Sequence, residues 1–148
     1  MKLDNNGYLL ITSFEGLSLK PYLDSVKIAT IGYGNCYYKD GKRVTLLDKP
    51  ITQPQAFELF KTIADRFALR VSGLVKTKLT QNQFNSLTSL CYNIGSANFE
   101  SSTLLRKVNI NPKDITIAFE FKKWNKAGGK VLLGLTTRRL KESDLYFK

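Results

Sequence analysis

The most regular pattern in the chain is a helical one at residues 52–71, TQPQAFELFKTIADRFALRV. Thr52 opens a T-x-x-Q capping box with Gln55, and Pro54 falls in the first turn, where proline is tolerated. Apolar side chains then recur at helical spacing. They are Ala56, Leu59, Phe60, Ile63, Ala64, Phe67, Ala68 and Val71. The pattern predicts a helix over 52–74, long enough to connect two lobes of one domain.

The residues before this helix change character at about residue 15. Residues 1–14 are expected to be helical, with Asn5 or Asn6 as the N-cap and Gly16 as the stop. Residues 15–60 are rich in Tyr, Ile, Val and Thr and are punctuated by glycine, which is typical of short strands and turns. We therefore expect a small β-rich lobe over 15–60.

Residues 75–148 are expected to be helical and to form the larger lobe together with residues 1–14. Helix starts are predicted at Thr80 with Gln83, at Ser101 or Ser102, and at Asn111-Pro112. Gly95 and Gly128-Gly129 are the expected stops, and a last amphipathic helix follows from about residue 135. A strand block separated from a helix block predicts an α+β fold.

Length and composition limit the class of protein. The 148 residues, 43 % of them hydrophobic, predict one domain with a buried core rather than a disordered chain. The longest apolar runs, 8–11 and 131–135, are too short to span a bilayer, and a cleaved secretory signal is not expected, because no charged segment followed by an apolar one is found at the start of the sequence. The net charge is +11, of which residues 75–148 carry +8. A basic half attracts a polyanion such as nucleic acid, an anionic membrane or a bacterial wall, or serves only solubility.

The chain has no histidine, which excludes histidine-based nucleophilic sites and most catalytic zinc sites. Its two cysteines, Cys36 and Cys91, are too few for a disulfide framework and are expected to be free thiols. Neither a metal ion nor another cofactor is expected. If the protein is a hydrolase, its acid and its base must be carboxylates.

Three residues form the candidate catalytic set. Glu15 is expected at the end of the first helix beside Phe14, where partial desolvation and the helix dipole favour the protonated carboxyl of a general acid. Asp24 and Thr30 become direct cross-strand partners if their hairpin is centred on Lys27, and their oxygens can then hold a water. The alternatives are a solvated Glu15 and an Asp24 that only begins the turn.

Around these residues the chain resembles the phage-type lysozymes (endolysins, glycoside hydrolase family 24). Glu15, Asp24 and Thr30 match the family's spacing of Glu, eight residues, Asp, five residues, Thr. Further similar blocks are FEGL at 14–17, TIGYG at 30–34, YNIG at 92–95, SSTLLR at 101–106, WNKAGGK at 124–130, and Gly134-Leu135 followed by Arg138-Arg139. Asn35-Cys36 departs from the His and hydroxyl residue that are common in the family, which affects local loop contacts.

The resemblance implies a two-lobed muramidase that cuts the β-1,4 bond between N-acetylmuramic acid and N-acetylglucosamine in peptidoglycan. It implies that Glu15 protonates the glycosidic oxygen and that Asp24 and Thr30 activate a water, with inversion at the anomeric carbon. It also places substrate contacts at Tyr92 and Thr103, with Cys36 facing them from the β-rich lobe; core packing is the other interpretation of Tyr92. Trp124 is expected in the core. Either Arg138 or Arg139, if it lay near Glu15, is expected to pair instead with another carboxylate or with substrate.

The expected partner is bacterial peptidoglycan, with neither nucleic acid nor stable membrane insertion. The protein is expected to be a monomer that stays in the host cytoplasm until a holin releases it to the wall. Three other functions remain open: a catalytically dead peptidoglycan-binding module, a nucleic-acid binder, and a transglycosylase that uses the same general acid but no water.

Overall fold

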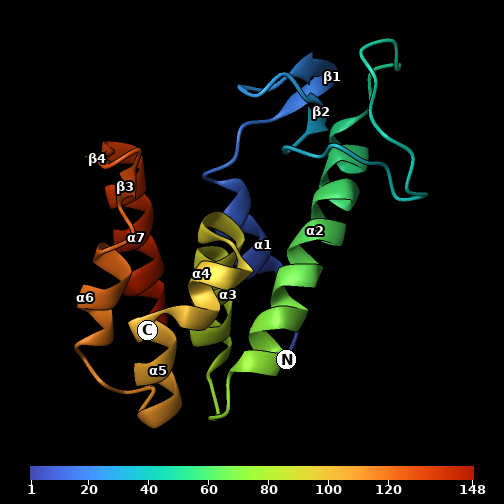
Figure 1. The fold of residues 1–148 in the computed structure, drawn as a ribbon. Coiled ribbons are helices and arrows are strands. Elements are labelled where there is room, and N and C mark those ends of the chain that lie inside the picture. Colours follow the sequence, from blue (N-terminus) through green and yellow to red (C-terminus); the bar gives the residue numbers. More distant parts are fainter. The chain divides into compact units, whose positions relative to one another are not determined.

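The protein, described by a computed structural model over residues 1–148, divides into two compact units. One unit contains Met1–Ile11 and Arg66–Lys148, and the other contains Thr12–Asp65. Short antiparallel strands occur with helices in the chain order drawn in Figure 1, so the predicted α+β fold class is confirmed. For convenience, Thr12–Asp65 is called the hairpin unit and the remainder the helical unit.

The hairpin unit contains β1 (Ser18–Leu23) and β2 (Ala29–Gly32), which pair antiparallel. The pairing register shifts between Ser18 and Tyr22, a segment that contains Pro21, which has no N–H to donate. Residues 33–52 form turns and isolated bridges, and they supply part of the small core. This core contains Ile31, Val44 and Leu59, with Ala29, Tyr38 and Ile51 packed against it.

Helix α2 (Gln53–Leu74) begins directly after the predicted capping residue. The Thr52 backbone N–H donates to Gln55 Oε1 over 2.8 Å, and the Gln55 backbone N–H donates to Thr52 Oγ1 over 3.3 Å. The capping box is therefore confirmed. Most of the predicted apolar positions are buried: Ala56, Leu59, Phe60, Ala64, Ala68 and Val71. The helix belongs to the hairpin unit as far as Asp65 and to the helical unit from Arg66.

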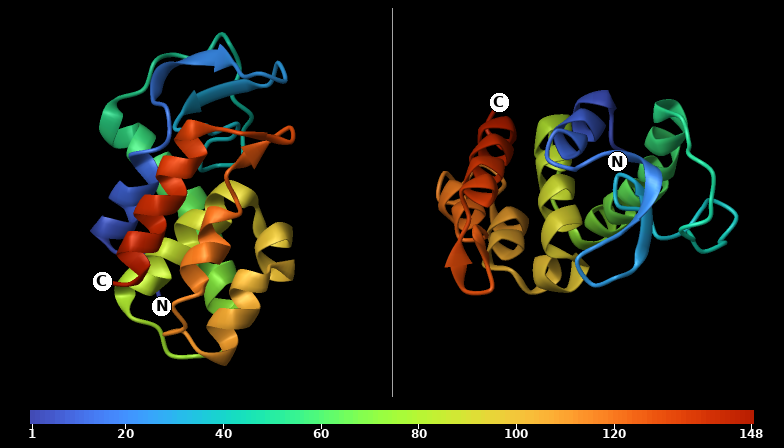
Figure 2. Two further views of the ribbon diagram at one scale, coloured as in Figure 1. Left: turned by 90° about the vertical axis from the view of Figure 1, so that its left-hand side faces the viewer. Right: turned by 90° about the horizontal axis from the view of Figure 1, so that it is seen from above.

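The helical unit is built from short helices (Figure 2). Their bounds are α1 (Asn5–Thr12), α3 (Gln81–Ile94), α4 (Ser96–Ser101), α5 (Thr103–Ile110), α6 (Ile117–Lys122) and α7 (Leu133–Tyr146). Helix α3 packs against α4 and α7, and α6 packs against α5 and α7. The Thr80–Gln83 capping box of α3 is confirmed, and Ser102 is the cap of α5. No helix combines the length and the apolar character needed to cross a bilayer.

The predicted ends of the first helix were wrong. Asp4, rather than Asn5 or Asn6, caps α1, because Asp4 Oδ1 accepts the Gly7 backbone N–H over 3.0 Å. The helix also ends at Thr12, well before Gly16. Capping is decided by which side-chain oxygen reaches a free N–H in the first turn, and several candidates in a row leave the choice open.

The predicted helix from Asn111-Pro112 to Gly128-Gly129 was also wrong. Helix α6 covers only Ile117–Lys122, preceded by a turn in which Asp114 Oδ1 accepts from the backbone and hydroxyl of Thr116. Gly128 and Gly129, both with positive φ, form the turn of a second hairpin, β3 (Lys126–Ala127) with β4 (Lys130–Val131). Two successive positive φ values are typical of the tight turn that joins such strands.

Candidate active site

Asp24 lies where β1 runs into the hairpin turn, and one of its carboxylate oxygens holds that turn together. Asp24 Oδ1 accepts the backbone N–H groups of Val26 and Ile28, each over 2.9 Å. Asp24 Oδ2 has no hydrogen-bond partner in the protein. The turn-forming alternative for Asp24 is therefore correct for one oxygen, and the second oxygen remains available to water or substrate.

Thr30 lies in β2 and is almost fully buried, with 2 % of its surface exposed. Its hydroxyl donates to the Ile28 carbonyl oxygen over 2.9 Å. Because the only proton of the hydroxyl is used in this bond, Thr30 Oγ1 can only accept from a further partner. Such a hydroxyl can bind a water by accepting one of the water's protons.

The hairpin register differs from the predicted one. Thr30 pairs with Tyr22, and Leu23 pairs with Ala29, so Asp24 and Thr30 are not direct partners, and the predicted partner of Thr30 was wrong by two residues. Lys27 has φ 61, and its N–H donates to the Asp24 carbonyl over 3.0 Å. A turn followed by one left-handed residue gives a three-residue loop centred on Val26.

The strand alternation nevertheless keeps Asp24 and Thr30 on one face of the hairpin. Tyr22 and Thr30 are directly opposed, and Asp24 is two residues beyond Tyr22, so its side chain returns to the same face. Diagonal neighbours of this kind lie roughly 7–8 Å apart, close enough for long or water-bridged contacts. Asp24 Oδ2 and Thr30 Oγ1 are thus two acceptors on one surface.

Glu15 belongs to the same unit and precedes β1 by three residues. It is half-buried and follows the end of α1, in a turn where its backbone N–H donates to the Thr12 carbonyl over 3.2 Å. The prediction that Glu15 occupies the last turn of the helix was therefore wrong. The three candidate catalytic residues all lie within Thr12–Asp65, on the segment before β1, on the hairpin turn and on β2.

Asn35 is a supporting residue that sequence reasoning did not identify. Its backbone exchanges two hydrogen bonds of 2.9 Å with Ile31, and its buried Nδ2 donates to the Leu59 carbonyl of α2 over 3.1 Å. Nearby Gly32 has φ 67, and a Cβ there would meet the Ala56 side chain at 3.5 Å. The Asn35–Leu59 hydrogen bond ties the end of β2 to α2, and with it the strand that carries Thr30.

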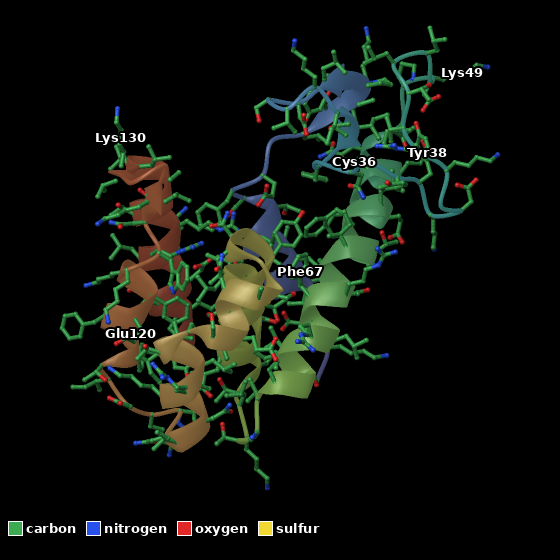
Figure 3. The ribbon with its side chains drawn as sticks, viewed as in Figure 1. Cys36, Tyr38, Lys49, Phe67, Glu120 and Lys130 are labelled. Atoms are coloured by element: carbon green, nitrogen blue, oxygen red, sulfur yellow. The ribbon has the colours of Figure 1, made fainter.

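Cys36 is half-buried in the loop after β2 and is a free thiol (Figure 3). Its Sγ lies 3.9 Å from Thr30 Oγ1. Within the hairpin unit, Cys36 is therefore a neighbour of the candidate water site. Cys91, the other cysteine, is also a free thiol, and burial raises its pKa to about 11.

The two other predicted substrate contacts lie in the helical unit. Tyr92 is half-buried, and its ring packs against that of Phe67 with centroids 5.3 Å apart. Thr103 is the first residue of α5, and its hydroxyl accepts from Arg106 over 2.8 Å. Thr103 also lines a hollow of about 270 Å³ with Glu120, Lys123 and Trp124, so Trp124 is only partly buried rather than in the core.

A buried charged network occupies the face of α7 that packs on α3. Glu142 Oε1 accepts from Ser89 Oγ (2.6 Å), Arg138 Nε (3.1 Å) and an Arg139 guanidinium nitrogen (3.0 Å). Arg139 Nε lies 2.8 Å from Glu142 Oε2 as an ion pair, without the angles of a hydrogen bond. Burial raises the pKa of Glu142, while Arg139 and Arg138 oppose that rise. Both arginines thus have a carboxylate partner in Glu142.

An apolar hollow of about 580 Å³ also opens in the hairpin unit. Its lining includes Tyr38, Ile51, Pro54 and Leu59, and none of the three catalytic candidates contributes to it. Tyr38 is held there by Asp48, whose Oδ2 accepts the phenol over 2.8 Å. Burial, followed by this hydrogen bond, raises the pKa of Tyr38 to about 12. Because none of the three catalytic candidates lines this hollow, it is not the candidate active site.

Comparison with known proteins shows the family to which this chain belongs. The family described as phage lysozyme matches residues 12–142. The endolysin of Bacillus phage PZA is 39 % identical over 99 % of this chain, which covers 55 % of that relative. The endolysin of Salmonella phage P22 is 36 % identical over 99 % of this chain and 98 % of its own length. The chain thus spans about half the length of the Bacillus phage relatives and nearly all of the P22 relative.

Solved structures give the same result for the fold. A crystal structure of a P22 lysozyme mutant superposes with a TM-score of 0.90 at 35 % identity, covering 100 % of this chain and 99 % of the other. The muramidase domain of SpmX from Asticaccaulis excentricus gives 0.83 at 32 % identity, covering 99 % and 98 %. The fold thus defines a lysozyme-like protein. Within that class, the chain belongs to the phage lysozyme family.

Proposed function

We propose that the protein is an endolysin that hydrolyses the β-1,4 bond between N-acetylmuramic acid and N-acetylglucosamine in peptidoglycan. The observation that carries the proposal is the pair of acceptors on one hairpin face: Asp24 Oδ2, without a partner, and Thr30 Oγ1, whose proton is used by Ile28. Membership of the phage lysozyme family supports the substrate class.

The acceptor chemistry suggests how the water is oriented. A water bound by Asp24 Oδ2 and Thr30 Oγ1 donates one proton to each, so an oxygen lone pair points away from both. Glu15 gives its proton to the glycosidic oxygen as the bond to the anomeric carbon breaks. The water oxygen bonds to that carbon from the opposite face, and its proton passes to Asp24, which inverts the configuration. An inverting site of this kind needs about 6.5–9.5 Å between its two carboxyl groups.

Substrate contacts at Tyr92, Thr103 and Cys36 complete the proposal. We further propose a monomer that acts on the wall after release from the host cytoplasm through a holin lesion. A transglycosylase remains the main alternative, because it needs Glu15 but no water. The paired acceptors favour hydrolysis, since they have no role where no water attacks.

Mass spectrometry of digested peptidoglycan distinguishes these reactions. Hydrolysis is expected to yield fragments with reducing-end muramic acid, and NMR of the fresh product is expected to show an inverted anomeric centre. Anhydro-muramic fragments would instead identify a transglycosylase. A retained configuration, or a glycosyl group trapped on Asp24, would make Asp24 a nucleophile rather than a base.

Thr30→Val tests the water-positioning role. Valine keeps the β-branched shape and removes the hydroxyl, so kcat is expected to fall about 10- to 100-fold, the effect of losing about 1.5–3 kcal/mol from one hydrogen bond in the transition state. KM on soluble peptidoglycan fragments should change little. Thr30→Ser restores the hydroxyl and is expected to recover most of kcat, which a purely structural role would not predict. An unchanged kcat in Thr30→Val would remove Thr30 from the mechanism.

A further inference from the structure

The second hairpin and the start of α7 form a continuous exposed segment of the helical unit. All residues from Lys126 to Gly134 are exposed, and we call this segment the hairpin tip. Lys126 pairs with Val131, and Ala127 pairs with Lys130, around the Gly128-Gly129 turn. Figure 3 labels Lys130 at the end of this hairpin, next to the start of α7.

Three successive aliphatic side chains are exposed on the tip. Val131 is 59 % exposed, Leu132 45 % and Leu133 81 %. A single exposed leucine is ordinary on a protein surface, but several adjacent apolar side chains beside charged ones are typical of an interaction site. The structure therefore leaves apolar surface on the tip that a partner could bury.

The charge next to these apolar side chains is entirely positive. Residues 121–141 contain no acidic side chain, and neither Lys126 nor Lys130 forms an ion pair. The N-terminus of α7 begins at Leu133 without a side-chain cap, so its dipole adds positive potential at the tip. The nearest acidic neighbour along the chain, Glu120, is buried and already paired with Lys107 and Lys123.

We propose that the hairpin tip docks on the surface of an anionic lipid bilayer. Lys126 and Lys130 contact the phosphate headgroups, and Val131 and Leu133 enter the boundary of the acyl chains. Glycan strands and nucleic acids have the charge or polarity to contact the lysines, but they offer no hydrocarbon in which the exposed aliphatic side chains can be buried. A small apolar group combined with basic residues gives weak, reversible attachment rather than insertion across the membrane. This inference does not rest on the proposed hydrolysis.

Vesicle sedimentation with the full chain tests the proposal. Binding is expected with vesicles of phosphatidylglycerol and phosphatidylcholine and not with phosphatidylcholine alone. Leu133→Ser is expected to lower the partition coefficient about tenfold, which corresponds to about 1.4 kcal/mol of lost apolar burial. Ile110→Ser is the matched control, because Ile110 is 84 % exposed at the end of α5 and outside the tip. It should bind as the parent does.

The charge contribution is measured separately. Lys126→Gln and Lys130→Gln are each expected to weaken binding about fivefold, whereas Lys113→Gln, on an exposed lysine outside the tip, should not. Activity on soluble peptidoglycan fragments should stay unchanged in every variant, so failure of this proposal is distinguishable from failure of the proposed function. The proposal would be overturned if Leu133→Ser bound vesicles as well as the parent does. It would also be overturned if the tip variants and the control variants lost vesicle binding equally, because binding would then depend only on general basic charge. Binding to purified sacculi but not to vesicles would overturn it as well.

Discussion

Glu15→Gln is expected to leave the fold intact and to reduce lysis of chloroform-permeabilised Gram-negative cells by about 10²–10⁴, the usual contribution of a general acid. The amide has the shape of the carboxyl group but no acidic proton to give to the glycosidic oxygen. Turbidity loss of the cells and release of reducing ends from purified peptidoglycan measure the effect.

Glu58→Gln is the matched control for this change. Glu58 is an exposed carboxylate of α2 in the same unit, and it forms a surface ion pair with Lys61. Its loss is expected to leave lysis and stability nearly unchanged, because such pairs contribute little. If Glu15→Gln retained activity within about tenfold of the parent while circular dichroism showed a native fold, Glu15 would not be the acid.

The parts of the fold that were predictable from sequence are those determined by local contacts. The capping boxes at Thr52 and Thr80 involve side chains only three residues apart, so the spacing alone predicts them. The long helix α2 was predictable because its apolar residues recur at the helical period, which places them on one packed face. The three catalytic candidates remain predictions for experiment, although their placement in one unit fits the proposal.

The features that were missed depend on turn geometry or on contacts distant in sequence. The predicted register of the β1–β2 hairpin was wrong because Lys27 adopts a positive φ, which its residue type does not indicate. Gly128-Gly129 was interpreted as the end of a helix, because two successive glycines are equally compatible with a helix end and with a hairpin turn. Asn35 anchors to Leu59, 24 residues away, and no local pattern reports such a bond.

Helix α7 shows a third kind of miss, because its buried face is largely charged rather than apolar. Leu140, which the amphipathic pattern favours as a core position, is exposed, whereas Arg138, Arg139 and Glu142 are buried. Hydrophobic periodicity cannot identify a core formed by charges that compensate one another. The consequence for stability is that Glu142 should matter more to this unit than most apolar residues of the same helix.

Glu142→Gln is accordingly expected to lower the free energy of unfolding by about 3–5 kcal/mol, the effect of breaking a buried ion pair. The amide cannot balance the charge of Arg139, whose guanidinium cannot reach water because its side chain is fully buried. Urea unfolding at constant m-value measures the loss. Glu100→Gln, which removes the exposed partner of Arg70, is the control and is expected to cost at most about 1 kcal/mol.

A double variant separates the charge from the packing. Suppose that Glu142→Gln loses stability because it leaves an arginine uncompensated. The double variant Arg139→Met with Glu142→Leu should then lose less free energy of unfolding than the sum of the losses in its two single variants. The reason is that the second substitution removes the charge that the first leaves unpaired. Strictly additive losses would mean that α7 depends on the shape of these side chains against α3. In that case the ion pairs of Glu142 with Arg138 and Arg139 would contribute little net stability, because their attraction would only offset the cost of burying the charges.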